Sequence, residues 1–326
     1  MQHSLLCRFQ GALVGSLIGE LVSHHLDQEL GDPVGRKSLQ FTKSKPKPSQ
    51  SHLYIPKLSA WSQIATCGIE SLIDTGRLNL DDWIIRCSQS QPSLLELKGK
   101  AQSSEAAVAT LPMALFFHEN QEWLRQHLVQ AAAIWQLETD ASTGVWAIAT
   151  AMALTLTETL NQTTLIPHIL RCLGTEQTIL AYQLQQVQTL IEVGADLETT
   201  KTKVRRPSAK LGNRGDASDM AIALAFYCFL YTPEDFRLCV IRAVRSGYQN
   251  QITAALTGAL AGVYNGINGI PVSWRVAALK LPVFKKRRQL TDQLLAVWLG
   301  VYDQNQINGR YKQAAIAAPD IIQRRL

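Results

Sequence analysis

The chain has 326 residues, of which 46% are apolar and 18% are charged. This proportion of apolar residues excludes a disordered chain and suffices for a sizeable core, at a length that one large helical domain can still reach. The net charge of +6 favours anionic partners only weakly. Since no zinc-finger, RRM or helix-turn-helix pattern accompanies it, we expect no nucleic-acid binding.

Helical periodicity runs through most of the sequence, whereas alternating strand patterns are nearly absent. Apolar residues recur at helical spacing over 64–73 and 180–191, and small residues crowd 146–157 and 252–266 as in closely packed central helices. Breakers predict long loops near 28–58 and 199–218. The sequence therefore predicts an all-α, compact single-domain bundle of ten or more helices over residues 1–326.

The apolar segments are too short to suggest a membrane protein. The longest, Val145 to Leu156, would not span a bilayer, and Glu20 soon follows the short apolar run from Gly11 to Ile18, so we expect neither a membrane span nor an export signal. Six cysteines lie singly, without C-x-x-C spacing, which indicates buried thiols in a reducing cytoplasm: Cys7, Cys67, Cys87, Cys172, Cys228 and Cys239.

Basic residues gather in two places. One cluster lies between Lys201 and Lys210 and the other covers Lys285, Lys286, Arg287 and Arg288, each close to a proline. Neither is interleaved with aromatic residues, so solvated loop charge is favoured over a phosphate-binding patch. A scaffold that captures partners through these basic loops remains open as an alternative.

Three segments carry a family resemblance. Residues 8–20 read R-F-Q-G-A-L-V-G-S-L-I-G-E, residues 59–63 read S-A-W-S-Q before a helical pattern, and residues 242–274 end in I-N-G-I-P-V-S-W. They resemble the opening helix, the Thr-Asp-Asp-Thr motif, and the Gly-Gly-Asp-Thr-Asp-Thr helix with its Ile-Pro-x-x-Trp turn of the ADP-ribosylglycohydrolase family. Residues 104–112 resemble the central segment of that family more weakly. The resemblance implies an all-α bundle of the ADP-ribosylglycohydrolase type.

Members of this family hold two magnesium ions between helices, through threonines and paired acids of these motifs. By position, the resemblance puts Ala60 and Trp61 in place of one acid pair, Gln249 and Gln251 in place of the other, and Ile252 in place of a threonine. A binuclear magnesium site needs several anionic oxygens, so we expect no bound metal or other cofactor and no family-type hydrolysis.

Two positions keep ligand atoms. Asp27 lies about where the family has a glutamate, and Ser59 replaces a threonine. The alternatives are an ordinary loop acid at Asp27 and a helix start capped by Asn250, with no ligand at Gln249 or Gln251. Signature motifs of serine hydrolases, zinc proteases and nucleotide-binding loops are absent.

The sequence therefore favours a non-catalytic relative that uses its helical scaffold to bind an unidentified protein or an ADP-ribose-like ligand. The vestigial site comprises Asp27, Ser59, Ala60, Trp61, Gln249, Gln251 and Ile252. The alternative is an active hydrolase of ADP-ribosyl or related N- or O-glycosidic bonds that uses other acids, with Glu20, Asp27 and Asp219 as the candidates.

Overall fold

A computed structural model describes residues 3–30, 58–135, 142–174, 178–205, 217–302 and 314–315. The chain winds through them as a bundle of α-helices, with a 3-10 turn at Pro92–Leu97 and a two-residue antiparallel pairing of Val301–Tyr302 (β1) with Ala314–Ala315 (β2). The α-helices are α1 Leu5–Leu30, α2 Ala60–Thr75, α3 Leu80–Ser90, α4 Ser103–Ala109, α5 Leu111–Phe116, α6 Gln121–Trp135, α7 Ser142–Leu156, α8 Leu165–Leu173, α9 Ile179–Glu192, α10 Leu197–Arg205, α11 Ala217–Leu230, α12 Phe236–Arg245, α13 Asn250–Gly269, α14 Val272–Ala278 and α15 Pro282–Trp298. The all-α prediction is confirmed.

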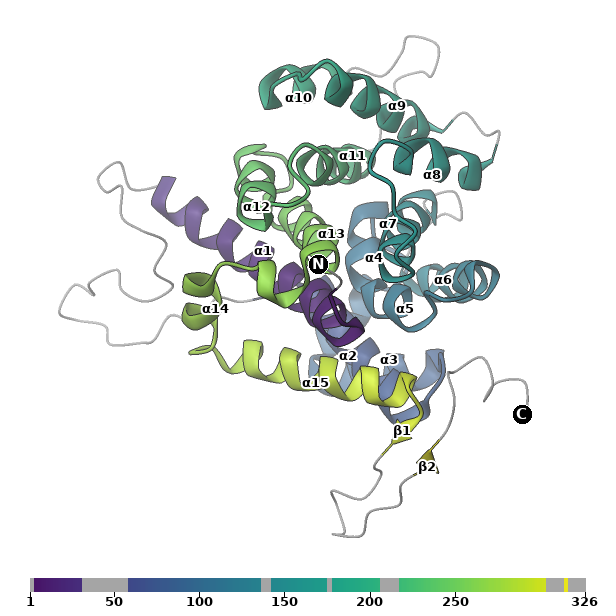
Figure 1. The fold of residues 1–326 in the computed structure, drawn as a ribbon. Coiled ribbons are helices and arrows are strands. Elements are labelled where there is room, and N and C mark those ends of the chain that lie inside the picture. The colour runs from purple at the N-terminus through teal and green to yellow at the C-terminus, as the bar shows by residue number, and fades with distance from the viewer. Residues whose placement is uncertain are drawn as a thin grey trace, which may run out of the picture.

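Helices α1 and α13 cross at the centre of the bundle, where they pack backbone against backbone (Figure 1). A Cβ built at Gly11, Gly15 or Gly19 would overlap the carbonyl oxygen of Gly262, Gly258 or Ala254 respectively. We call these six residues the glycine seam. Only glycine allows so close an approach at the three α1 positions, and this explains the small-residue spacing of residues 8–20.

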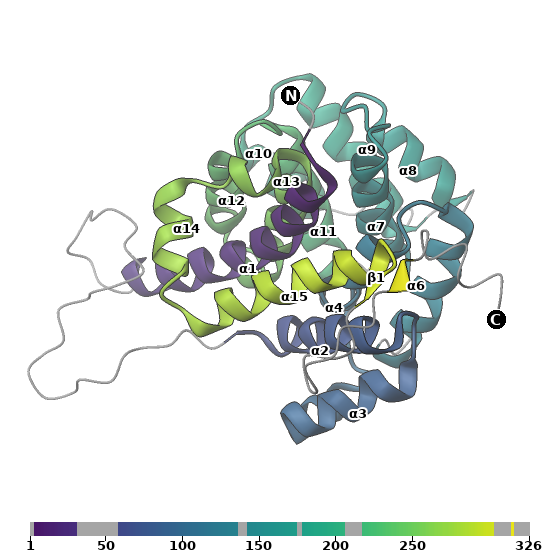
Figure 2. The ribbon, with the colours of Figure 1, turned by 60° about the horizontal axis from the view of Figure 1, so that its bottom comes forward.

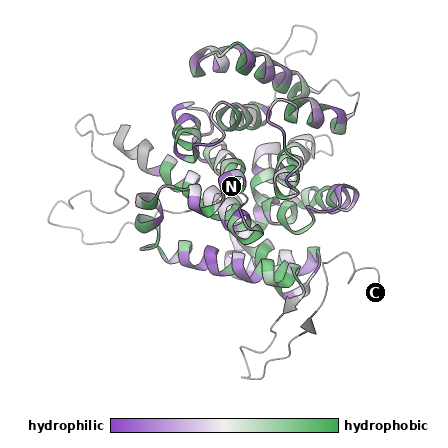
Figure 3. Ribbon diagram, in the orientation of Figure 1, coloured by the Kyte–Doolittle hydropathy of each residue, from purple (hydrophilic) through white to green (hydrophobic). Residues whose placement is uncertain are grey.

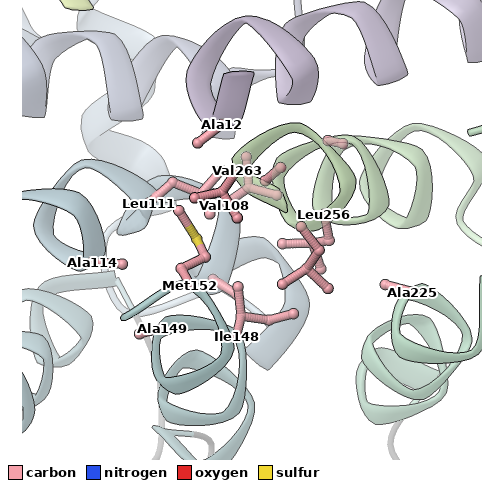
Figure 4. Close-up of a cluster of buried hydrophobic side chains, with 14 of the residues drawn as sticks. Ala12, Val108, Leu111, Ala114, Ile148, Ala149, Met152, Ala225, Leu256 and Val263 are labelled. Atoms are coloured by element: carbon pink, nitrogen blue, oxygen red, sulfur yellow. The ribbon is translucent and has the colours of Figure 1, made fainter. Parts of the chain in front are cut away.

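The other helices pack around this central pair in two groups. Helices α2, α3 and α15 lie on one side, and α8, α9 and α10 lie on the opposite side, beyond α11 (Figures 1 and 2). Apolar side chains concentrate on the inner helices, whereas α15 alternates apolar and polar positions (Figure 3). Ala12, Val108, Met152, Leu256 and Val263 meet in one part of the core that joins α1, α4, α7 and α13 (Figure 4).

Local sequence sets the helix boundaries near the candidate site. Ser59 caps α2 by accepting from the Ser62 amide at 3.2 Å, and Gly76 ends this helix in the left-handed region at φ 65°. Asn79 caps α3 through the Asp82 amide at 3.1 Å. Gln102 and Glu105 form a capping box at the start of α4. These caps determine where α2 and α4 start, and both starts belong to the site described below.

Two expectations from the sequence need adjustment. The predicted loop at 199–218 is helical over its first part, since α10 continues to Arg205, and residues 206–216 are outside the described part. Most of the loop predicted at 28–58 also lies outside it. By length and composition alone Leu5–His24 could cross a membrane, but 83% of its apolar window is buried inside the fold, as in the core helix of a globular bundle.

Candidate functional site

The start of α2 carries the first group of predicted site residues, Ser59, Ala60 and Trp61. Trp61 is only 6% exposed, and its ring packs edge-on against Trp135 of α6, with ring centroids 6.5 Å apart. Ala60 is half-buried against the core. The indole of Trp61 is therefore a packing group.

Glu20 reaches this helix start from α1. It is 2% exposed, and its two carboxylate oxygens accept separate hydrogen bonds, Oε1 from the Ser59 amide and Oε2 from the Ser62 hydroxyl at 2.5 Å. A carboxylate at the start of a helix is also favoured by the helix dipole. Glu20 is therefore used to fix α2 on α1, which leaves it poorly placed as the replacement acid of the rival hydrolase hypothesis.

Arg287 of α15 supplies a buried positive charge beside the same helix start. It is 1% exposed and donates through Nη2 to the Ser62 carbonyl oxygen at 3.0 Å and to the Thr66 hydroxyl at 2.7 Å. Burial lowers its pKa to about 10, while the negative charges of Glu20 and Glu70 oppose this shift. The guanidinium therefore stays charged at neutral pH and partly balances the charge of Glu20.

The position of Arg287 corrects an expectation from the sequence. The cluster from Lys285 to Arg288 lies on α15, not on a solvated loop, and Arg287 faces inward while its neighbours are exposed. The pattern contains a signal for this, since Arg287 shares a helix face with buried Phe284 and Leu294 at i−3 and i+7. The described part of the other cluster is also helical, with Lys203 and Arg205 exposed on α10.

The start of α13 holds the second group of predicted residues. Gln249 has a left-handed backbone, with φ 40° and ψ 51°, and its side-chain amide joins α13 to α4. Nε2 donates to Gln102 Oε1 at 2.9 Å, and Oε1 accepts from the Ser104 hydroxyl at 3.2 Å. A glutamine held in this strained region by two hydrogen bonds is a fixed part of the site.

The rest of this segment differs in part from the expectation. Gln249 is itself the N-cap residue, without a side-chain capping bond, and Asn250 begins the helix, so the predicted cap at Asn250 is wrong. Gln251 is half-buried, and Ile252 packs its side chain against the core. Ile252 therefore contributes apolar packing where the family resemblance implies a threonine ligand.

A closed chain of contacts brings these helix starts together. Glu20 of α1 accepts hydrogen bonds from the start of α2, where the Trp61 ring packs on Trp135. The Trp135 carbonyl oxygen accepts a hydrogen bond from the Ala101 amide at 2.7 Å. The next residue, Gln102, accepts a hydrogen bond from Gln249 at the start of α13. From Gln249, α13 runs to Ala254, which lies against Gly19, the residue before Glu20. We call Glu20, Ser59, Ala60, Trp61, Gln102 and Gln249 the helix-start cluster.

The two remaining acid candidates lie on α1 and α11. Asp27 lies in α1, seven residues beyond Glu20, so it is not a loop acid, and its side chain is outside the described part. Asp219 is half-buried in the first turn of α11. Of the candidate residues, the structure therefore brings together those at 20, 59–61 and 249. Neither Gln102 nor Arg287 was predicted from the sequence as a residue of this site.

The helix-start cluster does not fit two magnesium ions. Magnesium takes oxygen ligands and prefers carboxylates, but the positions where the resemblance implies acids hold a methyl group, a buried indole and two neutral amides. No group of three or more histidine, cysteine, aspartate or glutamate side chains that could hold a metal occurs among the residues described. The buried Arg287 charge would also repel a dication placed beside Glu20.

Comparison with known proteins agrees with the fold. A solved structure described as an ADP-ribosylglycohydrolase-related protein complex superimposes with a TM-score of 0.60 at 15% identity, over 90% of this chain and 98% of that chain. The ADP-ribosyl-[dinitrogen reductase] glycohydrolase of Rhodospirillum rubrum is 33% identical over 69 residues, which are 21% of this chain and 23% of that relative. The family model described as ADP-ribosylglycohydrolase matches residues 1–304. The chain therefore belongs to the ADP-ribosylglycohydrolase family.

Proposed function

We propose that this protein is a non-catalytic member of its family, a pseudoenzyme with a degenerate magnesium site whose scaffold binds a protein partner or a nucleotide-like ligand. The observation that carries the proposal is that Ala60, Trp61, Gln249 and Gln251 stand at positions where the family resemblance implies acids. Two metals close together need carboxylates to offset their mutual repulsion. Without them the ions that would orient water and substrate lack carboxylate ligands at these four positions.

The contacts of the substituted residues support this proposal. Trp61 is buried against Trp135, and both ends of the Gln249 amide are hydrogen-bonded within the protein. Releasing either side chain toward a metal would break the ring packing of Trp61 or the hydrogen bonds that Gln249 makes to Gln102 and Ser104. These contacts therefore support a site in which Trp61 and Gln249 do not serve as metal ligands.

The charge balance supports a ligand of anionic character. The starts of α2 and α13 carry Ser59, Ala60, Trp61 and Gln249 of the helix-start cluster, and a helix start carries partial positive charge. Arg287 adds a full positive charge near α2. With the metals and most of the acids gone, the phosphates of an ADP-ribose-like ligand are better matched to this environment than a cation is. The curated relative is named for ADP-ribosyl chemistry.

The proposal also covers the location and the domain organisation of the chain. Six cysteines without an expected disulfide fit a cytoplasmic location, where thiols stay reduced. The family match to 1–304 supports treating residues 1–326 as one ADP-ribosylglycohydrolase-like domain.

The experiment combines three measurements on the full chain. Calorimetric titration with magnesium should give no binding heat, and release assays with ADP-ribosyl-arginine and ADP-ribosyl-serine should give no turnover with or without magnesium. Calorimetric titration with free ADP-ribose should then give the same binding heat in magnesium and in EDTA. Robust metal-dependent turnover would refute the proposal.

The rival hydrolase makes a different prediction in the same assays. It requires turnover that does not follow the family's metal dependence and that depends on a replacement acid. Asp27→Asn is the variant that tests it, with Asp81→Asn, an exposed acid of α3, as the matched control. Turnover lost in Asp27→Asn and kept in Asp81→Asn would establish the rival.

A further inference from the structure

Helix α14 carries apolar side chains on its outer face as well as on its inner face. On the inner face Trp274 is buried, and its ring packs edge-on against Phe236 of α12, with ring centroids 6.3 Å apart. On the opposite face Val272, Val276 and Leu279 are 64%, 52% and 38% exposed. Their spacing of i, i+4 and i+7 places these three side chains, the aliphatic stripe, next to one another. A contiguous group of exposed apolar side chains marks an interaction surface, unlike single exposed ones.

The part of the sequence that contains the stripe is strongly basic. Residues 236–291 include nine lysines and arginines and no aspartate or glutamate. Because the net charge of the whole chain is +6, the remaining residues together carry a net charge of −3. The excess positive charge of the protein is therefore concentrated in the segment that includes α12, α14 and the first part of α15.

Two of these nine cations are used within the fold. Arg287 is buried, and Lys286 forms an ion pair with Glu70 of α2 at 2.7 Å. The cations that adjoin the aliphatic stripe along the chain are half-buried or exposed, and with the stripe they form what we call the α14 patch: Arg275, Lys280, Lys285 and Arg288. This patch combines apolar surface with positive charge.

The α14 patch lies on a protruding edge of the molecule. Helix α14 is at the outside of the bundle, beyond α1, and leads there into the start of α15 (Figures 1 and 2). Val272 and Val276 each expose more than half of their surface, whereas side chains that line a groove are more enclosed. A protruding apolar edge bordered by cations matches a broad anionic surface with an apolar interior better than it matches a single helix, which needs a groove.

Two other surfaces of the protein provide an internal contrast. Helix α10 exposes Lys203, but it also exposes Glu198, and its apolar Val204 is buried. Val193 at the end of α9 is 70% exposed, but it directly follows the exposed acid Glu192. Each place offers one of the two properties of the α14 patch without the other.

We propose that the α14 patch binds the surface of a membrane that contains anionic phospholipids. The aliphatic stripe enters the boundary between headgroups and acyl chains, and the surrounding cations contact the lipid phosphates. No segment crosses the bilayer in this mode of binding. The proposal does not depend on the proposed function, because no residue of the α14 patch belongs to the helix-start cluster.

The test mixes the full-length protein with vesicles and measures the fraction that sediments with them. Vesicles of phosphatidylcholine and phosphatidylglycerol should bind the protein, and vesicles of phosphatidylcholine alone should bind it at least about tenfold less. Binding to the anionic vesicles should weaken as salt is added, because salt screens the attraction. Absence of binding to anionic vesicles at low salt would overturn the proposal and leave an acidic protein as the candidate partner of the patch.

A variant of the aliphatic stripe tests whether apolar insertion contributes. The double variant Val272→Ser, Val276→Ser keeps every charge and should partition onto anionic vesicles at least about tenfold less than wild type. Val193→Ser is the matched control, since it removes an equally exposed valine outside the patch, and it should bind as wild type does. If the double variant binds as tightly as wild type, the stripe does not enter the membrane and the proposal fails.

A second variant tests the charges. Each cation near an anionic surface contributes a factor of about five to partitioning, so Lys280→Gln, Lys285→Gln should bind about 25-fold less. Lys203→Gln on α10 is the matched control and should change binding less than about twofold. An equal loss in the control would mean that net charge alone attracts the protein and would overturn the assignment to α14. All these positions are exposed, and equal melting temperatures would verify that the variants fold.

Discussion

The glycine seam and the helix-start cluster lie on the same two helices and depart from the family pattern to very different degrees. Along the seam, Gly11, Gly15 and Gly19 of α1 meet the carbonyls of α13 with no room for a Cβ. Glu20 directly follows Gly19 and Gln249 lies five residues before Ala254, and both side chains form hydrogen bonds to the starts of other helices. The close helix crossing and the proposed degenerate site therefore depend on different residues of the same two helices.

The start of α2 is nevertheless an integral part of the fold through its contacts with Arg287, and the largest predicted effect tests this. Replacing Arg287 by methionine removes the buried donor to Ser62 and Thr66 and leaves the charge of Glu20 less compensated. We expect a loss of about 3–5 kcal/mol in the free energy of unfolding, measured by denaturant titration. Arg288→Met, an exposed neighbour on α15, should stay within about 0.5 kcal/mol of wild type. Equal effects of the two variants would contradict the buried ion arrangement.

The seam should be less tolerant of added volume than any exposed helix position. Gly262→Ala would place a methyl group on the Gly11 carbonyl oxygen, so the two backbones must separate. We expect a destabilisation of about 1–3 kcal/mol by the same measurement. Gln289→Ala on the exposed face of α15 is the control and should be near neutral. A neutral Gly262→Ala would show that the crossing can widen without cost.

Two variants at Gln249 distinguish the stability contributed by its hydrogen bonds from the cost of its strained backbone. Gln249→Ala removes the bonds to Gln102 and Ser104 and keeps the left-handed φ of 40°, and should cost about 1–2 kcal/mol. Gln249→Gly removes the same bonds but relieves the strained backbone, and should be the more stable of the two by about 1 kcal/mol. Gln251→Ala is the control, since its side chain makes no hydrogen bond to the residues described.

The sequence predicted the seam far better than the cluster. Small residues spaced along 8–20 and 252–266 indicate close helix packing, because that information is local and periodic. The cluster depends on pairs that periodicity cannot reveal: Gln249 and Gln102 lie 147 residues apart in sequence, and Arg287 and Ser62 lie 225 apart. The resemblance located Ala60, Trp61, Gln249 and Gln251 as substituted positions, but only the structure gives their present partners. A cap at Asn250 was one alternative for the start of α13 because asparagine is a common cap, yet Gln249 occupies that position.

The smallest predicted effect is the absence of a metal response. Ligands that bind only the folded state raise the melting temperature. At a ligand concentration one hundred times the dissociation constant, they stabilise the folded state by about 2.7 kcal/mol. We expect wild-type protein to melt at the same temperature in millimolar magnesium and in EDTA, because the cluster offers one carboxylate whose oxygens are already hydrogen-bonded. The double variant Gln249→Asp, Gln251→Asp restores two anionic ligands and should gain a magnesium-dependent rise without gaining hydrolysis, since Trp61 and Arg287 remain in place. A magnesium-dependent rise in the melting temperature of the wild type would mean that acids outside the cluster hold the ion. The glycine seam and the helix-start cluster would then belong to one functional metal site.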